Sequence, residues 1–136
     1  MALNPIRIFI VDDNEGYHTL FRDILDGEPQ FECVGTALGG EAALRQIPQA
    51  KPDIILLNYV MMNWRAGRYI NGDETLTSLH DLYPSAVVIA TSALPEAEAI
   101  MESVGAVGFI SYPFDNADVI QTLRDVAKRY VNREEG

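Results

Sequence analysis

The sequence predicts a single α/β domain in which five parallel strands form a sheet covered by helices on both faces. Strand-sized apolar segments and amphipathic helical segments alternate five times with mostly short connections, the pattern of parallel sheets with right-handed crossovers. The run Ile54 to Leu57 is apolar without interruption and follows the breaker Pro52, as in a central strand buried on both faces. A chain of 136 residues suits one domain with one sizeable core.

The first half of the chain contains three predicted strands and two predicted helices. Ile6 to Val11 is rich in β-branched residues and predicts the first strand, and the polar residues at 12–14 can cap a following helix. That helix carries apolar residues at helical spacing, namely Tyr17, Leu20, Phe21, Ile24 and Leu25. Later segments predict a strand from Phe31 to Thr36, a helix from Glu41 to Ile47 closed by Pro48, and a strand from Asp53 to Asn58.

The second half continues the alternation after an irregular segment, Met61 to Gly72. Leu76, Leu79 and Leu82 indicate a helix that runs up to Pro84. The remaining predicted elements are a strand from Ala86 to Thr91, a helix from Pro95 to Val104 with Pro95 in its first turn, a strand from Val107 to Ile110, and a last helix carrying Val119, Leu123 and Val126.

Bulk composition limits the possible partners and the compartment. The net charge of −10 argues against direct nucleic-acid binding, because the phosphate backbone needs a basic surface. No apolar run is long enough for a transmembrane helix, and the first residues do not resemble a signal peptide. Cys33 is the single cysteine, so no internal disulfide can form, and we expect a cytoplasmic protein.

Polar side chains follow several of the predicted strands at one edge of the sheet. Asp12 and Asp13 follow the first strand, Asn58 ends the third, Thr91 ends the fourth, and Tyr112 follows the fifth. Ligands bind at this edge in open α/β sheets. Two adjacent carboxylates suit a divalent cation such as Mg²⁺, but the same residues could simply cap the first helix. The spacing alone leaves both interpretations open.

Five motifs in order give the chain a resemblance to the receiver domains of bacterial two-component response regulators. They are Ile8 to Asp13, Pro52 to Leu57 followed by Met61-Met62, Thr91-Ser92, Gly105-Ala106, and Pro113-Phe114. The resemblance covers essentially the whole chain and implies a flavodoxin-like (βα)5 fold with strand order 2-1-3-4-5. It also implies a receiver-like domain over residues 1–131, with 132–136 as a tail or the beginning of a linker.

The resemblance implies a chemistry for the strand ends. In the family, a phosphoryl group passes from a histidine kinase to an aspartate, with Mg²⁺ held by an acidic pair and the phosphate held by a lysine and a Thr or Ser. Asp12 and Asp13 match the acidic pair, and the backbone carbonyl of Val60 matches a metal ligand. Thr91 matches the hydroxyl residue, and Phe109 matches the aromatic residue that switches rotamer.

Two positions depart from the family. Asn58 stands at the phosphoacceptor position, and Tyr112 stands at the lysine position before Pro113. The neutral amide of Asn58 lacks the charge with which a carboxylate attacks phosphorus, and Tyr112 cannot supply an ammonium to a bound phosphate. The two changes remove one acid and one base together, which favours a natural loss of phosphorylation. The alternative is an Asp-to-Asn change introduced at position 58.

The acidic pair could still bind a cation, although only weakly. Two like charges about 4 Å apart cost on the order of 4 kcal/mol at an effective dielectric near 20. Without the lysine, Mg²⁺, a raised pKa on one Asp or separated side chains must relieve that repulsion. With Asn58 as a neutral ligand, we expect a magnesium site weaker than the family's, or none. No other cofactor is expected.

The segment after Met62 is longer than in the family and brings Trp64, Arg65, Arg68 and Tyr69 to the rim of the site. Such a cluster resembles an interface hot spot, but the loop could equally fold back over the phosphate pocket. His18 and His80 lie among polar residues on predicted helices, so we expect both at the surface.

The resemblance also implies a partner surface, formed by the fourth helix, the fifth strand and the last helix. Candidate contacts there are Glu96, Glu98, Glu102 and Arg124. We expect a signalling partner (a histidine kinase or an output protein) or a homodimer through this surface, and no activity as an enzyme. Two alternatives remain: a phosphoaccepting receiver in which Asn58 was introduced, and a small-ligand sensor that uses the vacated pocket and the inserted loop.

Overall fold

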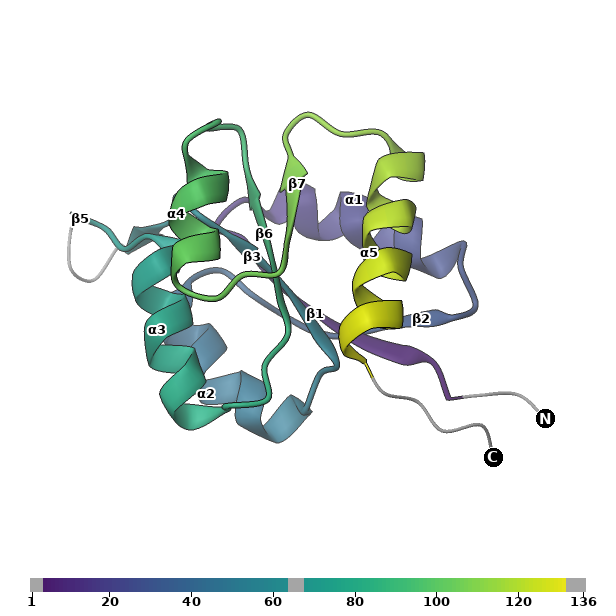
Figure 1. Ribbon diagram of the computed structural model, residues 1–136, viewed down its shortest axis with the longest axis horizontal. Helices are drawn as coiled ribbons and strands as arrows, with labels where there is room; N and C mark the ends of the chain where they lie inside the picture. The colour runs from purple at the N-terminus through teal and green to yellow at the C-terminus, as the bar shows by residue number, and fades with distance from the viewer. Residues whose placement is uncertain (1–3, 64–67, 132–136) are drawn as a thin grey trace.

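The computed structural model describes residues 4–63 and 68–131 as a three-layered α/β domain (Figure 1). In chain order the elements begin with β1 (Ile6–Val11), α1 (Glu15–Asp26), β2 (Phe31–Ala37), α2 (Gly40–Ala50) and β3 (Ile54–Asn58). A small hairpin follows, β4 (Met62–Asn63) and β5 (Arg68–Tyr69). The chain continues with α3 (Gly72–Leu82), β6 (Val88–Ser92), α4 (Ala97–Ser103), β7 (Gly108–Ser111) and α5 (Asn116–Tyr130).

The main sheet confirms the predicted topology. Its strand order is β2-β1-β3-β6-β7 and every neighbouring pair is parallel. Numbered as the five strands of this sheet alone, the order is 2-1-3-4-5, as the family resemblance implied. Because β1, β3 and β6 are adjacent, their carboxyl ends bring the polar residues that follow them to one edge of the sheet.

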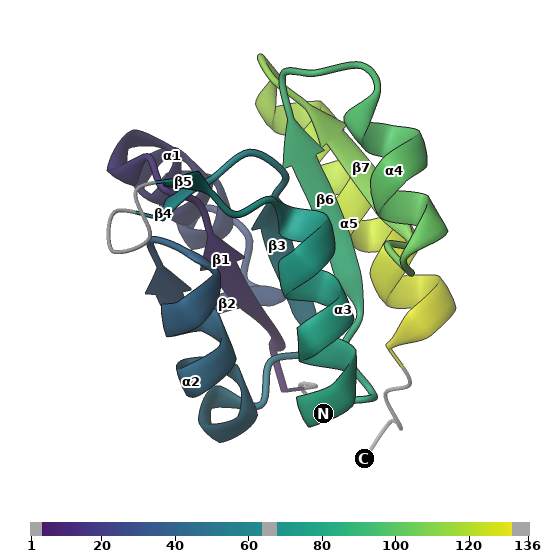
Figure 2. The same cartoon turned by 90° about the vertical axis from the view of Figure 1, so that its left-hand side faces the viewer.

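Helices cover both faces of the sheet, as the sequence predicted. Figures 1 and 2 show α1 and α5 on one face and α2, α3 and α4 on the other. The residues of β3 alternate between the two cores: Ile54 and Leu56 pack with α1 and α5, whereas Ile55 and Leu57 pack with the other three helices. All four are at most 1% exposed. This burial on both faces explains the unbroken apolar run of the central strand.

Three local predictions were wrong. Pro48 does not close its helix, because α2 continues to Ala50 and ends when Lys51 adopts a left-handed conformation with φ 51°. Pro48 removes one backbone donor near the end of the helix, but the last turn still closes through the Lys51 N–H, which donates to the carbonyl of Ile47 at 2.9 Å. Pro95 precedes α4 instead of beginning it, in a turn closed by the Ala97 N–H donating to the carbonyl of Leu94. The irregular segment contains the β4–β5 hairpin.

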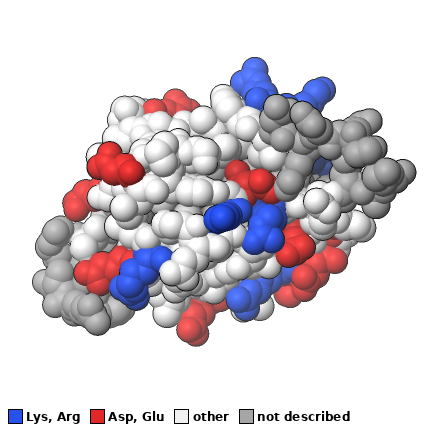
Figure 3. Space-filling model, turned by 90° about the horizontal axis from the view of Figure 1, so that it is seen from below, with Lys and Arg blue, Asp and Glu red and all other residues white. Residues whose placement is uncertain are grey.

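The charge of the chain is distributed without a single basic surface on the face that Figure 3 shows. Lys and Arg side chains lie there among Asp and Glu side chains. Within residues 4–63 and 68–131, no helix is both long and apolar enough to cross a membrane.

Candidate functional site

The side chains predicted to form the site come together at the carboxyl ends of β1, β3 and β6. Asn58 is the last residue of β3 and pairs in register with Thr91 of β6. Asp12 follows Val11, the last residue of β1. Asp12 and Thr91 are each 1% exposed, and Asn58 is 8% exposed, as is Tyr112 after β7. The site is therefore a buried polar cluster inside the edge of the sheet.

The hydroxyl of Tyr112 connects two of the strand ends. Its oxygen lies 2.6 Å from Oδ2 of Asp12 and 2.9 Å from Oγ1 of Thr91. A tyrosine hydroxyl has one proton, which the carboxylate attracts more strongly than another hydroxyl does. The chain of donors therefore runs from Thr91 to Tyr112 and from Tyr112 to Asp12. The sequence predicted that these residues share a pocket, but it did not predict that Tyr112 fills it.

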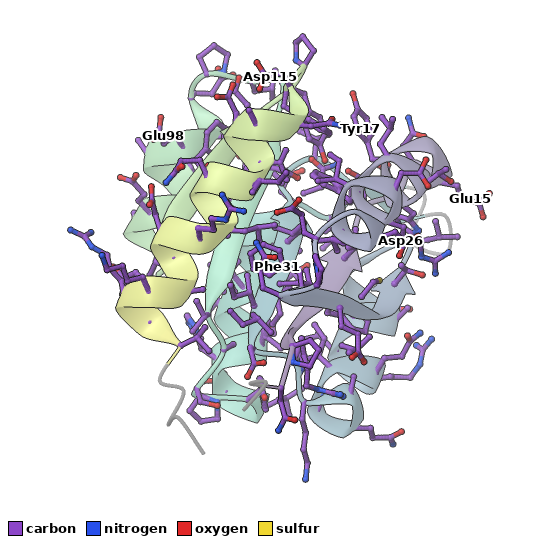
Figure 4. All side chains as sticks on the ribbon, turned by 90° about the vertical axis from the view of Figure 1, so that its right-hand side faces the viewer. Glu15, Tyr17, Asp26, Phe31, Glu98 and Asp115 are labelled. Atoms are coloured by element: carbon purple, nitrogen blue, oxygen red, sulfur yellow. The ribbon has the colours of Figure 1, made fainter. Side chains whose placement is uncertain are left out.

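Aromatic rings fix the position of the Tyr112 side chain. Tyr17 of α1 stacks on it with ring centroids 4.0 Å apart and planes 12° apart. Phe21 and Phe114 lie against the same ring at 6.3 Å and 5.6 Å between centroids. Figure 4 shows Tyr17 extending from α1 at the edge of the sheet where the strands end. Sequence reasoning assigned Tyr17 only to the apolar face of its helix, because the ring contact spans distant parts of the chain.

Burial determines the protonation of the Asp12–Tyr112 pair. The pKa of Asp12 is raised above its ordinary value of 3.8, mainly by loss of solvent, while hydrogen bonds from Tyr112 and the Asn14 amide oppose that rise. The pKa of Tyr112 is also raised, first by burial and then by the Asp12 carboxylate beside it. Tyr112 therefore keeps its proton at any physiological pH and remains the donor in this pair.

His18 supports the same strand end and is not a surface residue, contrary to the prediction. Its ring is 7% exposed, and Nε2 lies 2.7 Å from the backbone carbonyl of Asp12. Because a carbonyl only accepts, Nε2 carries the proton and donates. His80 is half-buried, beside Gly105. Polar neighbours in sequence misled the prediction for His18, because its partner is a backbone group that composition does not reveal.

Three of the residues implied as magnesium ligands take part in hydrogen bonds within the chain. The side-chain amide of Asn58 donates to the backbone carbonyl of Val60 at 2.9 Å. Oδ1 of Asp12 accepts from the Asn14 amide at 2.9 Å, and Oδ2 accepts from Tyr112. Among the described residues, no group of three or more His, Cys, Asp and Glu side chains is arranged to hold a metal. A Mg²⁺ ion at this position would therefore have to compete with the hydrogen-bond donors that Asp12 and Val60 already have.

The partner surface predicted from the resemblance is only partly assembled. Glu96, Glu98 and Glu102 are exposed at or near α4, and Phe109 of β7 is half-buried against the core beneath α2, α3 and α4. Arg124 instead forms an ion pair with Glu28 at 2.9 Å, which places it on the α1 side of α5. The structure therefore separates Arg124 from the three glutamates.

A shallow groove of about 320 Å³, which the sequence did not predict, lies along the edge strand beside α5. It is lined by Phe109, Ile110, Ser111, Pro113, Phe114, Asp118, Gln121 and Thr122. In Figure 4, Glu98 and Asp115 mark α4 and the beginning of α5 near this edge, whereas Tyr17 marks the α1 side. We call β7, α4, and the exposed side of α5 that carries Asp118 and Thr122 the edge surface.

The inserted loop is described only in part. Arg68 and Tyr69 form β5, whose backbone pairs with Met62 and Asn63 in an antiparallel hairpin. Trp64 and Arg65 lie outside the described residues. The predictions made for the side chains of this loop therefore stay predictions.

A model of the response regulator receiver domain matches residues 8–124. The chain belongs to this family. That match includes every strand of the main sheet, apart from the first residues of β1, and both Asn58 and Tyr112.

Among curated proteins, the chain is 31% identical over 136 residues to a protein-glutamate methylesterase/protein-glutamine glutaminase of Thermotoga maritima. That alignment covers 98% of this chain and 37% of the relative, so the chain spans about a third of such proteins. It is also 28% identical over 124 residues to the chemotaxis protein CheY of the same organism, covering 90% of this chain and 98% of CheY.

Solved structures agree with this placement. The response regulator domain of Thermotoga maritima CheB superposes with a TM-score of 0.79 at 28% identity, covering 97% of this chain and all of that domain. A Borrelia burgdorferi complex of CheX with CheY, BeF3 and magnesium contains a chain that superposes with a TM-score of 0.79 at 28% identity, covering 90% of this chain and 89% of the matched chain. The chain is thus a receiver domain of two-component signalling.

Proposed function

We propose that this receiver does not accept a phosphoryl group at the usual position and signals through protein contacts instead. The observation that carries the proposal is Asn58, which stands at the acceptor position with its amide nitrogen donating to the Val60 carbonyl at 2.9 Å. An amide oxygen lacks the negative charge of a carboxylate and is a poor nucleophile. Its nitrogen is held as a donor, so the side chain acts as a structural link between β3 and the following loop.

Protein contacts are the remaining route by which a receiver with an inert pocket can act. The edge surface is exposed, contains a groove and carries glutamates on α4. The relative from Borrelia burgdorferi was solved in complex with another protein, CheX, which shows that a receiver of this likeness binds a protein partner. We infer a signalling partner, or a second copy of this chain, on the edge surface.

The vacated-pocket alternative, a small-ligand sensor, is less well supported. The Tyr112 hydroxyl lies between Asp12 and Thr91, so a ligand would have to displace it and break both hydrogen bonds. The other alternative, an Asn introduced at position 58, predicts that Asn58→Asp alone restores phosphorylation.

Intact-mass spectrometry tests the proposal. The unaltered protein is incubated with acetyl phosphate and Mg²⁺, with the CheY relative from Thermotoga maritima as a parallel control. We expect no phosphate-sized mass gain in this chain under conditions that label the control. A gain that mild base removes would contradict the proposal and would point to an acyl phosphate on another aspartate, such as Asp13.

A further inference from the structure

The hydroxyl of Tyr112 lies between Asp12 and Thr91, the two residues that the family resemblance places beside a bound phosphoryl group. We propose that Tyr112 is a built-in occupant of this pocket and blocks phosphoryl acceptance independently of Asn58. An acidic acceptor restored at position 58 would then not be sufficient for phosphorylation. The inference rests on the proposed function and deepens it, because it assigns the block to a second residue.

Strand order places the hydroxyl in front of the acceptor position. Asp12 follows β1 and Thr91 belongs to β6, and these two strands flank β3 on either side. Neighbouring strands lie about 4.8 Å apart, so β1 and β6 are separated by about twice that distance. One oxygen atom within hydrogen-bonding distance of both side chains therefore lies between the ends of β1 and β6, the region in which β3 ends at Asn58.

The hydroxyl of Thr91 hydrogen-bonds to Tyr112, so its proton is already used within the chain. Its hydroxyl has one proton, which the donor chain directs to the Tyr112 oxygen. The backbone of Tyr112 holds the same region, because its amide donates to the carbonyl of Ser92 at 2.9 Å. The side chain of Ser92 in turn accepts from the Leu94 amide at 3.0 Å. The beginning of the β6–α4 connection is thus fixed by contacts within the chain.

The ring of Tyr112 is held firmly in this position. Its stack on Tyr17 and its contacts with Phe21 and Phe114 would be lost if the side chain swung outward. Outward movement would also leave the buried carboxylate of Asp12 without its Tyr112 donor, and an unpaired buried group is costly. A phosphoryl group would have to overcome all of these contacts to enter.

Charge gives a further reason why an acceptor alone is insufficient. Asn58→Asp would place a third carboxylate beside Asp12 and Asp13. Like charges raise one another's pKa, and a protonated carboxyl is a poor nucleophile. Replacement of Tyr112 by Lys would remove the occupant and supply a cation that can pair with both the carboxylate and the incoming phosphate.

The test compares Asn58→Asp alone with the double variants Asn58→Asp/Tyr112→Lys and Asn58→Asp/Tyr112→Phe. In the reaction with acetyl phosphate, the carboxylate oxygen at position 58 would form a bond to phosphorus while the bond from phosphorus to the acetyl oxygen breaks, releasing acetate. Labelling is followed by intact mass in the presence of Mg²⁺. Asn58→Asp/Tyr83→Phe is the matched control, since Tyr83 also loses a hydroxyl hydrogen bond, to the Pro52 carbonyl, but far from the pocket.

We expect the Lys double variant to label at least about tenfold faster than Asn58→Asp, the size of one charge-assisted hydrogen bond in a transition state. The Phe double variant should fall between them, and the Tyr83 control should match Asn58→Asp. Circular dichroism and thermal unfolding verify that each variant folds. A folded Lys double variant that labels no faster than Asn58→Asp would overturn the inference.

A second measurement needs only the single variant Tyr112→Phe and covers the case in which a double variant does not fold. In the unaltered protein, ultraviolet titration counts the tyrosines that ionise as pH rises to about 12, where ordinary phenols with a pKa near 10 have titrated. Tyr112→Phe should leave that count unchanged if the hydroxyl is held in the buried pocket, and a count lower by one would show a solvent-accessible hydroxyl and contradict the inference. Phosphate uptake by the unaltered protein would instead refute the proposed function, so the two failures are distinguishable.

Discussion

The strand-end pocket and the edge surface differ in how their polar groups are satisfied. In the pocket, Asp12, Thr91 and Tyr112 are almost fully buried and hydrogen-bond to one another. At the edge surface, Glu98 is exposed on α4, and the exposed Asp118 and Gln121 line a groove together with apolar residues such as Phe109 and Phe114. A pocket whose donors and acceptors are already paired gains little from a ligand, whereas an open groove gains from apolar burial.

This difference suggests separate roles for the two regions, one in stability and one in partner binding. On our proposal, the pocket serves to hold the ends of β1, β3 and β6 together, and the edge surface is the region that recognises a partner. Substitutions should therefore have opposite consequences in the two regions. Changes in the pocket should alter stability, and changes at the edge should alter binding with little effect on stability.

The largest effect on stability is expected for Tyr112→Phe. The substitution keeps the ring stack but removes the donor from the buried Asp12 carboxylate, which should lower the free energy of unfolding by about 1–3 kcal/mol. Urea denaturation measures it. Tyr83→Phe is the control: its half-buried hydroxyl bonds the Pro52 carbonyl at 3.1 Å, and its loss should cost about 0.5–1.5 kcal/mol. If Tyr112→Phe lowered the free energy of unfolding by less than Tyr83→Phe does, the pocket would not contribute more to stability than an ordinary hydroxyl hydrogen bond, and our account of the pocket would be contradicted.

A second prediction concerns pH, through the raised pKa of Asp12. Because the folded protein binds the proton more tightly than the unfolded chain, this group favours folding at low pH, and that contribution is lost as pH rises from about 4 through the folded-state pKa. We expect the unfolding free energy of the unaltered protein to fall relative to that of Asp12→Asn over this interval.

The measurement is urea denaturation of both proteins at several pH values above about 4, in EDTA so that no cation contributes. Asp12→Asn has its own cost, because an amide cannot accept from both Asn14 and Tyr112 as the carboxylate does. The slope with pH, and not the absolute difference, is therefore the readout. A difference that stays constant, or that favours the unaltered protein as pH rises, would contradict the account of Asp12.

The smallest effect on stability is expected at the edge surface. Glu98→Gln and Glu102→Gln remove exposed charges from α4 and should change the unfolding free energy by less than about 0.5 kcal/mol each. Binding to a captured partner should weaken and lose salt dependence in the same variants. Exposed Asp23 on α1 supplies the control, since Asp23→Asn makes the same charge change away from the edge surface. Equal losses of binding for both changes would argue against a role for this surface.

The fold followed from the sequence because its determinants are local. The apolar run of β3 and the alternation of strands and helices fixed the sheet, and the order of five motifs identified the family. The same reasoning brought Asp12, Asn58, Thr91 and Tyr112 to one site, because parallel strands end at one edge.

Two kinds of contact could not be predicted from the sequence: those between side chains far apart in the chain, and those between a side chain and a backbone group. The stack of Tyr17 on Tyr112 joins residues far apart in the chain, and His18 is buried by a bond to the carbonyl of Asp12. Arg124 was predicted to lie with the glutamates of α4, but which side of a helix faces a neighbour depends on packing, and its partner is Glu28.

The most direct test of the central claim is the ¹H–¹⁵N spectrum of the unaltered protein with and without beryllofluoride and Mg²⁺. Beryllofluoride stands in for a phosphoryl group at a receiver's acceptor and needs no covalent step. Our account predicts that the amide signals of Asn58, Thr91 and Ser111 do not move, because the pocket is filled and its polar groups are paired. Shifts that begin at Asn58 and extend through Thr91 to α4 would contradict it, since they would show a pocket that still admits phosphate and reports it to the edge surface.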